Sequence, residues 1–169
     1  LPRPSKEKQS TVVEKLQQTF PHSVLAVQEF RDGTTVHLKK EDIVAVCTFL
    51  RDDEACKFDY CNDICGADAY TPENRFEVIY NMYSLALNHR ILLKVFVDES
   101  DPHVATVSTV WNGAAWPERE AFDMYGIIFD GHTDLRRMYM PEEFQYYPLR
   151  KDFPLMGVPE SIPLPRKNN

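Results

Sequence analysis

The stretch RFEVIYNMYSLALNHRILLKVFVDES, residues 75–100, decides how this 169-residue chain folds. It contains two runs rich in β-branched, aromatic and aliphatic residues, which meet at the pair Asn88 and His89. In the second run apolar side chains recur at every other position, the period of a β-strand: Ile91, Leu93, Val95 and Val97. The stretch therefore predicts the two longest strands of a sheet.

The segments upstream of this stretch add a hairpin, two helices and a further strand. The runs VLAVQEF and TTVHLKK flank Arg-Asp-Gly, which indicates a β-hairpin. Apolar residues at helical spacing predict one helix that Ser10 or Thr11 caps and Pro21 ends, and a second over residues 41–50. KFDYCNDICGADAY, residues 57–70, mixes aromatic residues with turn formers and predicts a strand followed by a loop.

The segments downstream complete the domain. Residues 101–115 are compatible with either a strand or a helical turn. Pro117 suits the first turn of a helix and Gly126 suits its exit, which predicts a helix over residues 116–125. This order of elements predicts an α+β fold, with one mixed or antiparallel sheet of about four or five strands and helices packed on one face.

The last 29 residues differ in character from the rest of the chain. Six of the twelve prolines fall here, so neither a helix nor an interior strand can continue. Large apolar side chains nevertheless recur in this segment: Leu149, Phe153, Leu155, Met156, Val158, Ile162 and Leu164. We therefore expect a loose segment at residues 1–8, an α+β domain at 9–140 and an extended, proline-rich docking tail at 141–169.

Charge and hydropathy exclude several classes of protein. The formal net charge is −7 and the pI is about 5.2, which argues against a nucleic-acid binder. No apolar run approaches the roughly 18–20 residues that a membrane span requires. Neither a glycine-rich phosphate loop nor a dinucleotide fingerprint occurs in the sequence. We therefore expect no direct membrane span, no nucleic-acid partner and no nucleotide site.

Four cysteines lie within nineteen residues and raise the question of a metal or redox site. Cys56, Cys61 and Cys65 are spaced unlike the paired ligands of structural zinc sites and unlike cluster-binding runs, and Cys47 belongs to another element. Because cysteine often serves as a small buried apolar residue, we favour packing over metal binding. Their number and spacing also favour a reducing compartment over a secreted disulfide scaffold. A small metal or redox protein remains an alternative.

A second cluster of candidate residues lies in and after the predicted helix at 116–125. Glu118 and Glu120 point in different directions on a helix, whereas Arg119 and Asp123 are four residues apart and fit a surface ion pair. A carboxylate enzyme built on Glu118, Glu120 and Asp123 is the alternative, but paired catalytic carboxylates need converging side chains. Further on, acidic residues interleave with a basic group, which favours mutual pairing over a phosphate site: His132, Arg136, Arg137, Arg150 and Lys151.

The segment EREAFDMYGIIFDGHTDLRRMYMPEEFQYYPLRKDFPL, residues 118–155, resembles the signature of the C subunit of proton-pumping NADH:quinone oxidoreductase, the thirty-kilodalton subunit of respiratory complex I. RFEVIYNMYSL and HRILLKVFV are also similar to the family, so the resemblance covers about residues 58–157. It implies orienting and interface roles for a set of signature residues: Glu118, Arg119, Glu120, Asp123, His132, Arg136, Arg137, Pro148, Leu149, Arg150, Lys151 and Asp152.

The resemblance also implies a place for the chain in a larger assembly. It implies a non-catalytic structural subunit of the hydrophilic arm, with no catalytic, cofactor-binding or metal-binding residues of its own. Iron-sulfur clusters, FMN and quinone would be carried by partner subunits. The expected partners are the quinone-site D subunit and neighbouring iron-sulfur subunits, on the cytoplasmic side of a bacterial inner membrane or the matrix side in mitochondria.

Related assemblies leave the electron donor open at this stage. Ferredoxin-dependent, F420-linked and hydrogenase-linked membrane complexes contain similar subunits, so an equivalent subunit of one of these is the alternative interpretation. The completeness of the signature favours the NADH-linked complex, in which electron transfer to quinone is coupled to proton translocation.

Overall fold

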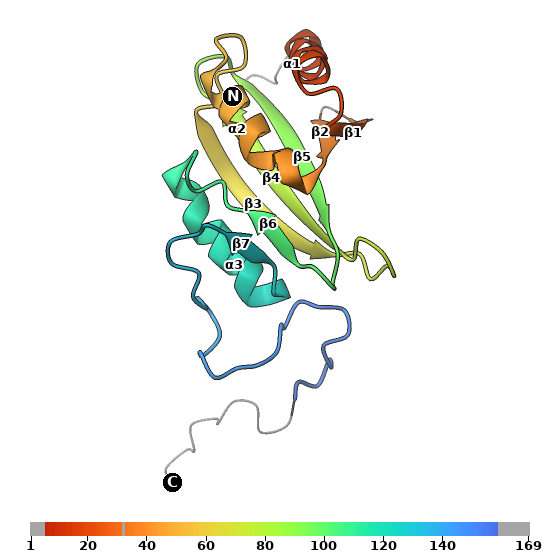
Figure 1. Cartoon of the computed structure of the whole chain (residues 1–169), viewed down its shortest axis with the longest axis vertical. Helices are drawn as coiled ribbons and strands as arrows, with labels where there is room; N and C mark the ends of the chain where they lie inside the picture. Colours follow the sequence, from red (N-terminus) through yellow and green to blue (C-terminus); the bar gives the residue numbers. More distant parts are fainter. Residues whose placement is uncertain (1–5, 32, 159–169) are drawn as a thin grey trace.

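The structure, a computed structural model, describes residues 6–31 and 33–158 (Figure 1). Its α-helices are α1 (Lys6–Thr19), α2 (Ile43–Asp52) and α3 (Ala115–Tyr125), and short 3-10 turns occupy Lys40–Asp42 and Asn112–Ala114. Its strands are β1 (Val24–Phe30), β2 (Gly33–Leu38), β3 (Tyr60–Asp68), β4 (Phe76–Ser84), β5 (His89–Val97), β6 (His103–Ala105) and β7 (Ile128–Asp130). Within these described residues, no helix combines the length and apolar character needed to cross a membrane.

Five strands form one mixed sheet in the order β1-β2-β5-β4-β3. β2 and β5 run parallel, whereas the other neighbouring pairs are antiparallel. β4 and β5 pair along their whole length, from Phe76 opposite Val97 to Ser84 opposite His89. The two strands predicted from residues 75–100 therefore form an antiparallel pair inside the sheet.

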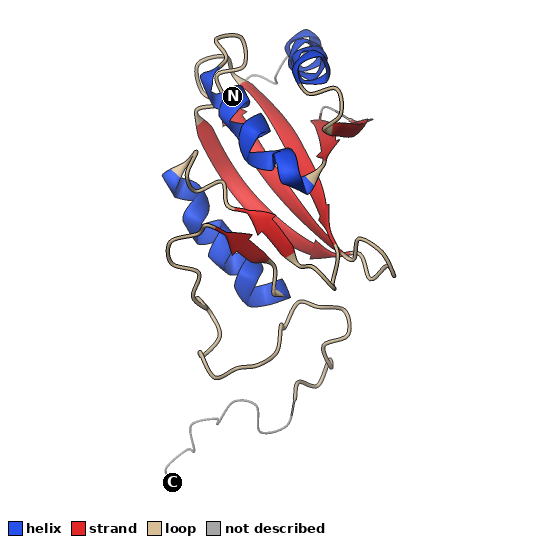
Figure 2. Cartoon of the chain, in the orientation of Figure 1, coloured by secondary structure: helices blue, strands red, loops and turns tan. Residues whose placement is uncertain are grey.

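One face of this sheet carries the hydrophobic core. Alternate residues of β4 and β5 are buried, while the residues between them are partly exposed or exposed. All three α-helices contribute to the same core cluster: Val12 and Leu16 from α1, Ile43, Val46, Cys47 and Leu50 from α2, and Ala121 from α3. Figure 2 shows α2 lying across the sheet and α3 beside β3. The predicted α+β class, with a mixed main sheet, is confirmed.

A second, two-stranded sheet resolves the ambiguity of residues 101–115. β6 pairs in parallel with β7, and the N–H of Thr106 continues the pairing to the carbonyl of Asp130 at 2.9 Å. A 3-10 turn then leads into α3. The segment therefore contains both a short strand and a helical turn, and its strand partner lies on the far side of α3 in the sequence.

The N-terminal boundaries differ from the prediction. α1 begins at Lys6, so residues 6–8 are helical, and Ser10 and Thr11 lie inside the helix instead of capping it. Lysine, glutamate and glutamine are good helix formers, which explains the extension upstream of the apolar stripe. Residues 41 and 42 belong to the 3-10 turn that precedes α2. The rest of the predicted loose segment, residues 1–5, lies outside the described residues.

After β7 the chain continues to residue 158 in turns, without helix or strand (Figure 1). Phe144 is buried, and its ring contacts the rings of Tyr146 and Phe153. Leu155 and Met156, by contrast, are 101% and 94% exposed. Residues 159–169 of the predicted docking tail, including Ile162 and Leu164, lie outside the described residues.

Candidate functional site

Helix α3 organises the signature residues. It begins one residue before the predicted start and ends at Tyr125, as predicted. Gly126 has φ of +78°, in the left-handed region that favours glycine, and its N–H donates to the carbonyl of Phe122. A Cβ at this position would meet the ring of Tyr147 at 2.6 Å. The helix exit is therefore fixed both by backbone conformation and by close packing of the segment that follows.

Glu118 is fully buried and ties α3 to the loop after β6. Its carboxylate accepts hydrogen bonds from the Thr106 hydroxyl and, at 2.7 Å, from the N–H of Val107. Burial raises the pKa of Glu118 to about 7, although these two hydrogen bonds lower it in part. The resemblance implied an orienting or interface role for Glu118, and its side chain contacts residues of its own domain.

Asp123 is also fully buried and binds the backbone N–H groups of the loop at residues 138–140. One carboxylate oxygen accepts from the N–H groups of Met138, Tyr139 and Met140 at 2.6–3.0 Å, and the other pairs with Arg137 at 2.8 Å. Burial alone would raise the pKa of Asp123, but these hydrogen bonds outweigh it and hold the pKa below its usual value. Asp123 therefore fixes the shape of this loop as a charged anchor.

The predicted surface ion pair between Arg119 and Asp123 is wrong. Arg119 donates instead to the carbonyls of Arg136 and Arg137 at 3.1 and 3.2 Å, and its guanidinium lies 4.8 Å from the centre of the Trp116 ring. The spacing of four residues is compatible with an ion pair. The loop after β7 instead offers backbone carbonyls to Arg119 and backbone N–H groups to Asp123. Contacts distant in the sequence have replaced the local pair.

His132 and Arg136 complete the loop after β7. The His132 side chain is buried, its Nε2 lies 3.0 Å from the carbonyl of Ala115, and its Nδ1 accepts from the N–H of Asp134 at 3.0 Å. Arg136 is exposed and pairs with Asp134. The predicted pairing with an interleaved acidic residue is found for Arg136, whereas Arg137 pairs with Asp123 of α3.

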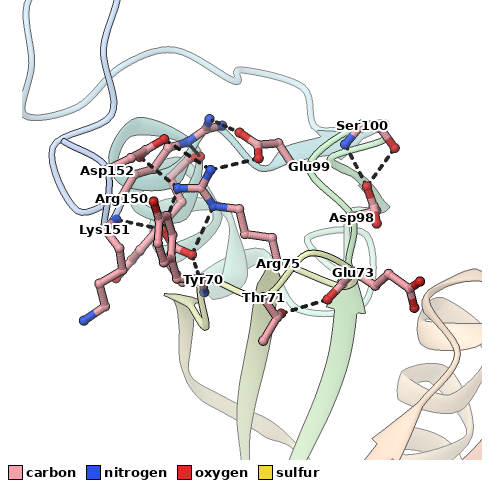
Figure 3. A network of polar contacts seen from close by, with 12 residues as sticks. Tyr70, Thr71, Glu73, Arg75, Asp98, Glu99, Ser100, Arg150, Lys151 and Asp152 are labelled. Atoms are coloured by element: carbon pink, nitrogen blue, oxygen red, sulfur yellow. Dashed lines mark hydrogen bonds and ion pairs between the residues drawn. The ribbon is translucent and has the colours of Figure 1, made fainter.

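A second network is centred on Arg75, which the sequence reasoning did not single out. Its buried guanidinium pairs with Asp68 at 2.9 Å, Glu99 at 2.8 Å and Asp152 at 2.8 Å (Figure 3). Hydrogen bonds to Asp68 and Asp152 raise the pKa of Arg75 above its usual value. No local signal in the sequence could have found this cluster, because its members come from β3, the start of β4, the loop after β5 and the C-terminal segment.

Arg150 and Lys151 hold the start of the predicted tail against the domain. Arg150 donates to the carbonyl of Tyr125 at 2.7 Å, and its guanidinium lies 4.4 Å from the centre of the Tyr147 ring. The backbone N–H of Lys151 donates to Asp68 at 2.7 Å. Residues 150–152 therefore bind their own domain, although they lie within the docking tail predicted for residues 141–169.

The cysteines do not gather into one site. Cys47, Cys56 and Cys61 are buried, and Cys65 is exposed on β3. Burial raises the pKa of both Cys56 and Cys61 to about 12, with smaller contributions from nearby carboxylates. Within residues 6–31 and 33–158, no group of three or more histidine, cysteine, aspartate or glutamate side chains is arranged to hold a metal ion.

The outer side of α3 and the segment after it present large apolar side chains to solvent. Trp116 is 62% exposed, Tyr139 is 63% exposed and Leu149 is 51% exposed, and Glu120 is also exposed. Pro148, beside Leu149, is partly exposed. Tyr139 and Leu149 both lie near Glu120 of α3, and exposed large apolar residues around one helix are typical of a surface that another protein covers.

This geometry favours a scaffold over a carboxylate active site. Glu118 binds the loop after β6, Asp123 binds the loop at 138–140, and Glu120 faces solvent, so the three carboxylates serve three different surroundings. A catalytic pair would need two of them to converge on one substrate. The buried charges of α3 instead hold the loops that frame the apolar outer side of the helix.

Comparison with known proteins places this architecture in a family. Residues 36–159 match the family described as "Respiratory-chain NADH dehydrogenase, 30 Kd subunit". The C subunit of the NADH-quinone oxidoreductase of Roseiflexus castenholzii is 46% identical over 145 residues, which cover 86% of this chain and 83% of that protein. The C 2 subunit of the NADH-quinone oxidoreductase of Rhizobium meliloti is 51% identical over 122 residues, which cover 72% of this chain and 66% of that protein.

Two solved structures share the fold. A trypsin-resistant fragment of Nqo5 matches with a TM-score of 0.61 and 29% identity, over 76% of this chain and 99% of that chain. A chain of the membrane-bound sulfane sulfur reductase, an archaeal respiratory membrane complex, matches with a TM-score of 0.73 over 88% of this chain and 87% of that chain. Its sequence identity is 19%, so this match shows the fold alone. Because the family match spans most of its length, the chain belongs to the thirty-kilodalton, or C, subunit family of respiratory-chain NADH dehydrogenase.

Proposed function

We propose that the chain is a non-catalytic structural subunit of the hydrophilic arm of a membrane-associated NADH:quinone oxidoreductase. In this role it packs against the quinone-site D subunit and neighbouring iron-sulfur subunits and supports electron transfer to quinone, coupled to proton translocation. Iron-sulfur clusters, FMN and quinone belong to those partners. The chain is peripheral, on the cytoplasmic side of a bacterial inner membrane or on the matrix side in mitochondria.

The observation that carries this proposal is the division of α3 between inner and outer residues. Glu118, Arg119 and Asp123 are buried and bonded to loops of their own domain. Trp116 and Glu120 on the same helix are exposed. Three charged groups of this helix bind internal loops, while Trp116 and Glu120 face solvent, and this arrangement suits a subunit that presents a surface to partners.

The exposed end of the described chain supports the same role. Leu155 and Met156 have their whole side chains in solvent, although each could contribute roughly 1.5–3 kcal/mol if buried. The domain itself offers them no cover. We infer that the segment from residue 154 onward lies along a neighbouring subunit, in the manner of an extended peptide in a groove.

The NADH-linked complex is favoured over its relatives that use other donors. The named relatives at 46% and 51% identity are subunits of NADH-quinone oxidoreductases, whereas the sulfane sulfur reductase chain is similar in fold alone. An equivalent subunit of a ferredoxin-, F420- or hydrogenase-linked complex is the alternative, because the described residues include no donor site that would separate them.

The test is to identify the assembly that contains the chain. A tagged copy, expressed at its natural level in its own host, is purified from membranes solubilised with a mild detergent. We expect it to elute with quinone-site and iron-sulfur subunits, in the fraction that transfers electrons from NADH to quinone. Elution with subunits of a complex that uses another donor would select the alternative, and elution as a free protein would refute the proposal.

A further inference from the structure

A groove between β3 and α3 is left open by the contacts described above. Its volume is 290 Å³, and its walls include Asp63 and Cys65 from β3, Glu120 and Met124 from α3, and Leu149 from the segment that follows. We call it the acidic groove. It lies on the same side of the domain as the exposed residues of α3, because Glu120 and Leu149 belong to both.

The fold fixes the width of the acidic groove. A Cβ at Gly66 would meet the ring of Tyr125 at 2.5 Å, so the absence of a side chain at this position lets the end of α3 pack closely on β3. The β3–β4 register shifts between Cys61 and Asp63, just where the groove begins. Such bulges re-aim the side chains that follow them. The walls are therefore set by a glycine contact and an irregular strand, features of the rigid domain.

The groove carries two carboxylates and no cation on its walls. Within the described residues, Asp63 accepts from the N–H of Ile64 and the thiol of Cys65, and Glu120 accepts only a long 3.5 Å hydrogen bond from Tyr139; neither forms an ion pair. Burial raises the pKa of Cys65 to about 11, with further contributions from its hydrogen bond to Asp63 and then from the charges of Asp63 and Glu120. Asp63, Cys65 and Glu120 all line this one small space.

The shape and chemistry of the groove indicate what it accepts. Its volume is at the lower limit of the range of about 300–1,000 Å³ found for small-molecule sites, and it holds one long side chain comfortably. Two negative charges attract a cation, while Met124 and Leu149 offer apolar walls to the methylene groups of lysine or arginine. We propose that the acidic groove receives a lysine or arginine side chain from an apolar segment of a neighbouring subunit.

This inference rests on the proposed function, because it names the chemistry of one contact within that assembly. It goes further by assigning the contact to specific residues on β3 and α3. It also explains why Glu120 stays exposed while the other two carboxylates of α3 are buried and satisfied. The first two organise the domain, and the third is available to a partner.

The first experiment uses Cys65 as a footprint. It is the exposed cysteine of the four, so a maleimide reagent followed by mass spectrometry reads its accessibility in the unaltered protein. We expect labelling of Cys65 in the free chain and loss of that labelling in the purified complex. A matched control is the Glu54→Cys variant, at an exposed position beyond the end of α2, which should remain labelled in both. Equal labelling of Cys65 in the free and assembled chain would overturn the proposal.

The second experiment tests the charge. Retention in the purified complex is compared for wild type, Glu120→Gln and Glu120→Lys, with Glu54→Lys as the control for an identical charge change at another exposed site. We expect retention to fall in the order wild type, Gln, Lys, with Lys at least about tenfold below wild type, and the control to match wild type. Asp63→Asn, added to Glu120→Gln, should lower retention further.

These outcomes separate the groove from the proposed function. If wild type does not copurify with a quinone reductase, the proposed function fails. If wild type assembles and all Glu120 variants assemble equally, the groove proposal fails alone. Protection of Cys65 that rises with the concentration of the free chain would assign the groove to a second copy of this chain, and would also overturn the proposal.

Discussion

Replacing the buried carboxyl of Glu118 by an amide should remove a pH-dependent loss of stability. In Glu118→Gln, the amide oxygen can accept the N–H of Val107 and the NH₂ group can donate to the Thr106 hydroxyl, so the shape and hydrogen bonding are retained. The side chain cannot ionise. Any difference in the pH dependence of unfolding between the two proteins then arises from the loss of this one carboxyl group and of its contacts.

The magnitude follows from the shift in pKa. Burial raises the pKa of Glu118 from 4.5 to about 7, a difference of 2.5 units, and each unit corresponds to about 1.36 kcal/mol. Because the folded pKa lies above the unfolded one, the folded state binds more protons between these values. Stability is therefore fully present below pH 4.5, declines as pH rises, and is lower by up to about 3 kcal/mol above pH 7.

Other titratable groups surround Glu118, and the comparison must allow for them. Cys47, Cys61 and Tyr80 are buried near it, and burial raises the pKa of each of these groups, so they stay neutral over the range of the experiment. His132 lies 3.9 Å away, with Nδ1 accepting a backbone N–H and Nε2 facing the carbonyl of Ala115. The substitution removes the carboxylate that faces His132, so the difference between the two proteins includes the loss of this contact.

The assay is urea unfolding of the isolated chain at several pH values between 4.5 and 8. Unfolding is monitored by circular dichroism and by tryptophan fluorescence, to which the buried Trp111 contributes. With a slope of about 1–3 kcal/mol per molar urea, 3 kcal/mol corresponds to a midpoint shift of roughly 1–3 M. We expect wild type and Glu118→Gln to coincide near pH 4.5 and the variant to be more stable at pH 8. Glu120→Gln, on the exposed side of α3, should follow wild type; parallel curves for wild type and Glu118→Gln would refute the reasoning.

The remaining contacts of the domain lead to three further predictions. Asp123→Asn should lower the free energy of unfolding by about 3–5 kcal/mol, measured by urea unfolding, because it breaks a buried pair with Arg137. Truncation after residue 153 should leave the stability of the free domain nearly unchanged and reduce its retention in the complex. Truncation after Pro148 should also destabilise the free domain, because Arg75 loses its partner Asp152. Equal stability of the two truncated domains would contradict this prediction. The purified chain should show no visible absorption from flavin or iron-sulfur clusters, and a band that returns after refolding with iron would contradict it.

Local patterns in the sequence were enough to predict the elements that form the middle of the domain. The alternation in residues 75–100 predicted β4 and β5, since a strand with one buried face leaves a period of two. Pro117 and Gly126 predicted both ends of α3, because each has a fixed backbone preference that does not depend on distant residues. The helical spacing of apolar residues predicted α2 in the same way.

The parts that could not be predicted depend on contacts between distant segments. Arg75 gathers Asp68, Glu99 and Asp152, and the last of these is 77 residues away along the chain. Helical spacing suggested that Arg119 would pair with a neighbour four residues away. The loop after β7 instead supplies its acceptors, and no sequence pattern fixes the position of that loop relative to α3.

The contacts of residues 150–152 fix the place where the predicted tail leaves the domain. Residues 150–152 are bound through Tyr125, Glu99, Asp68 and Arg75, so the segment leaves the domain from a fixed place. Beyond it, Leu155 and Met156 extend fully into solvent. Anchoring the base of an extended segment reduces the conformational entropy that a partner must overcome to order the rest. The internal salt bridges therefore fix the place where the tail begins. The exposed apolar residues that follow provide the surface that binding would bury.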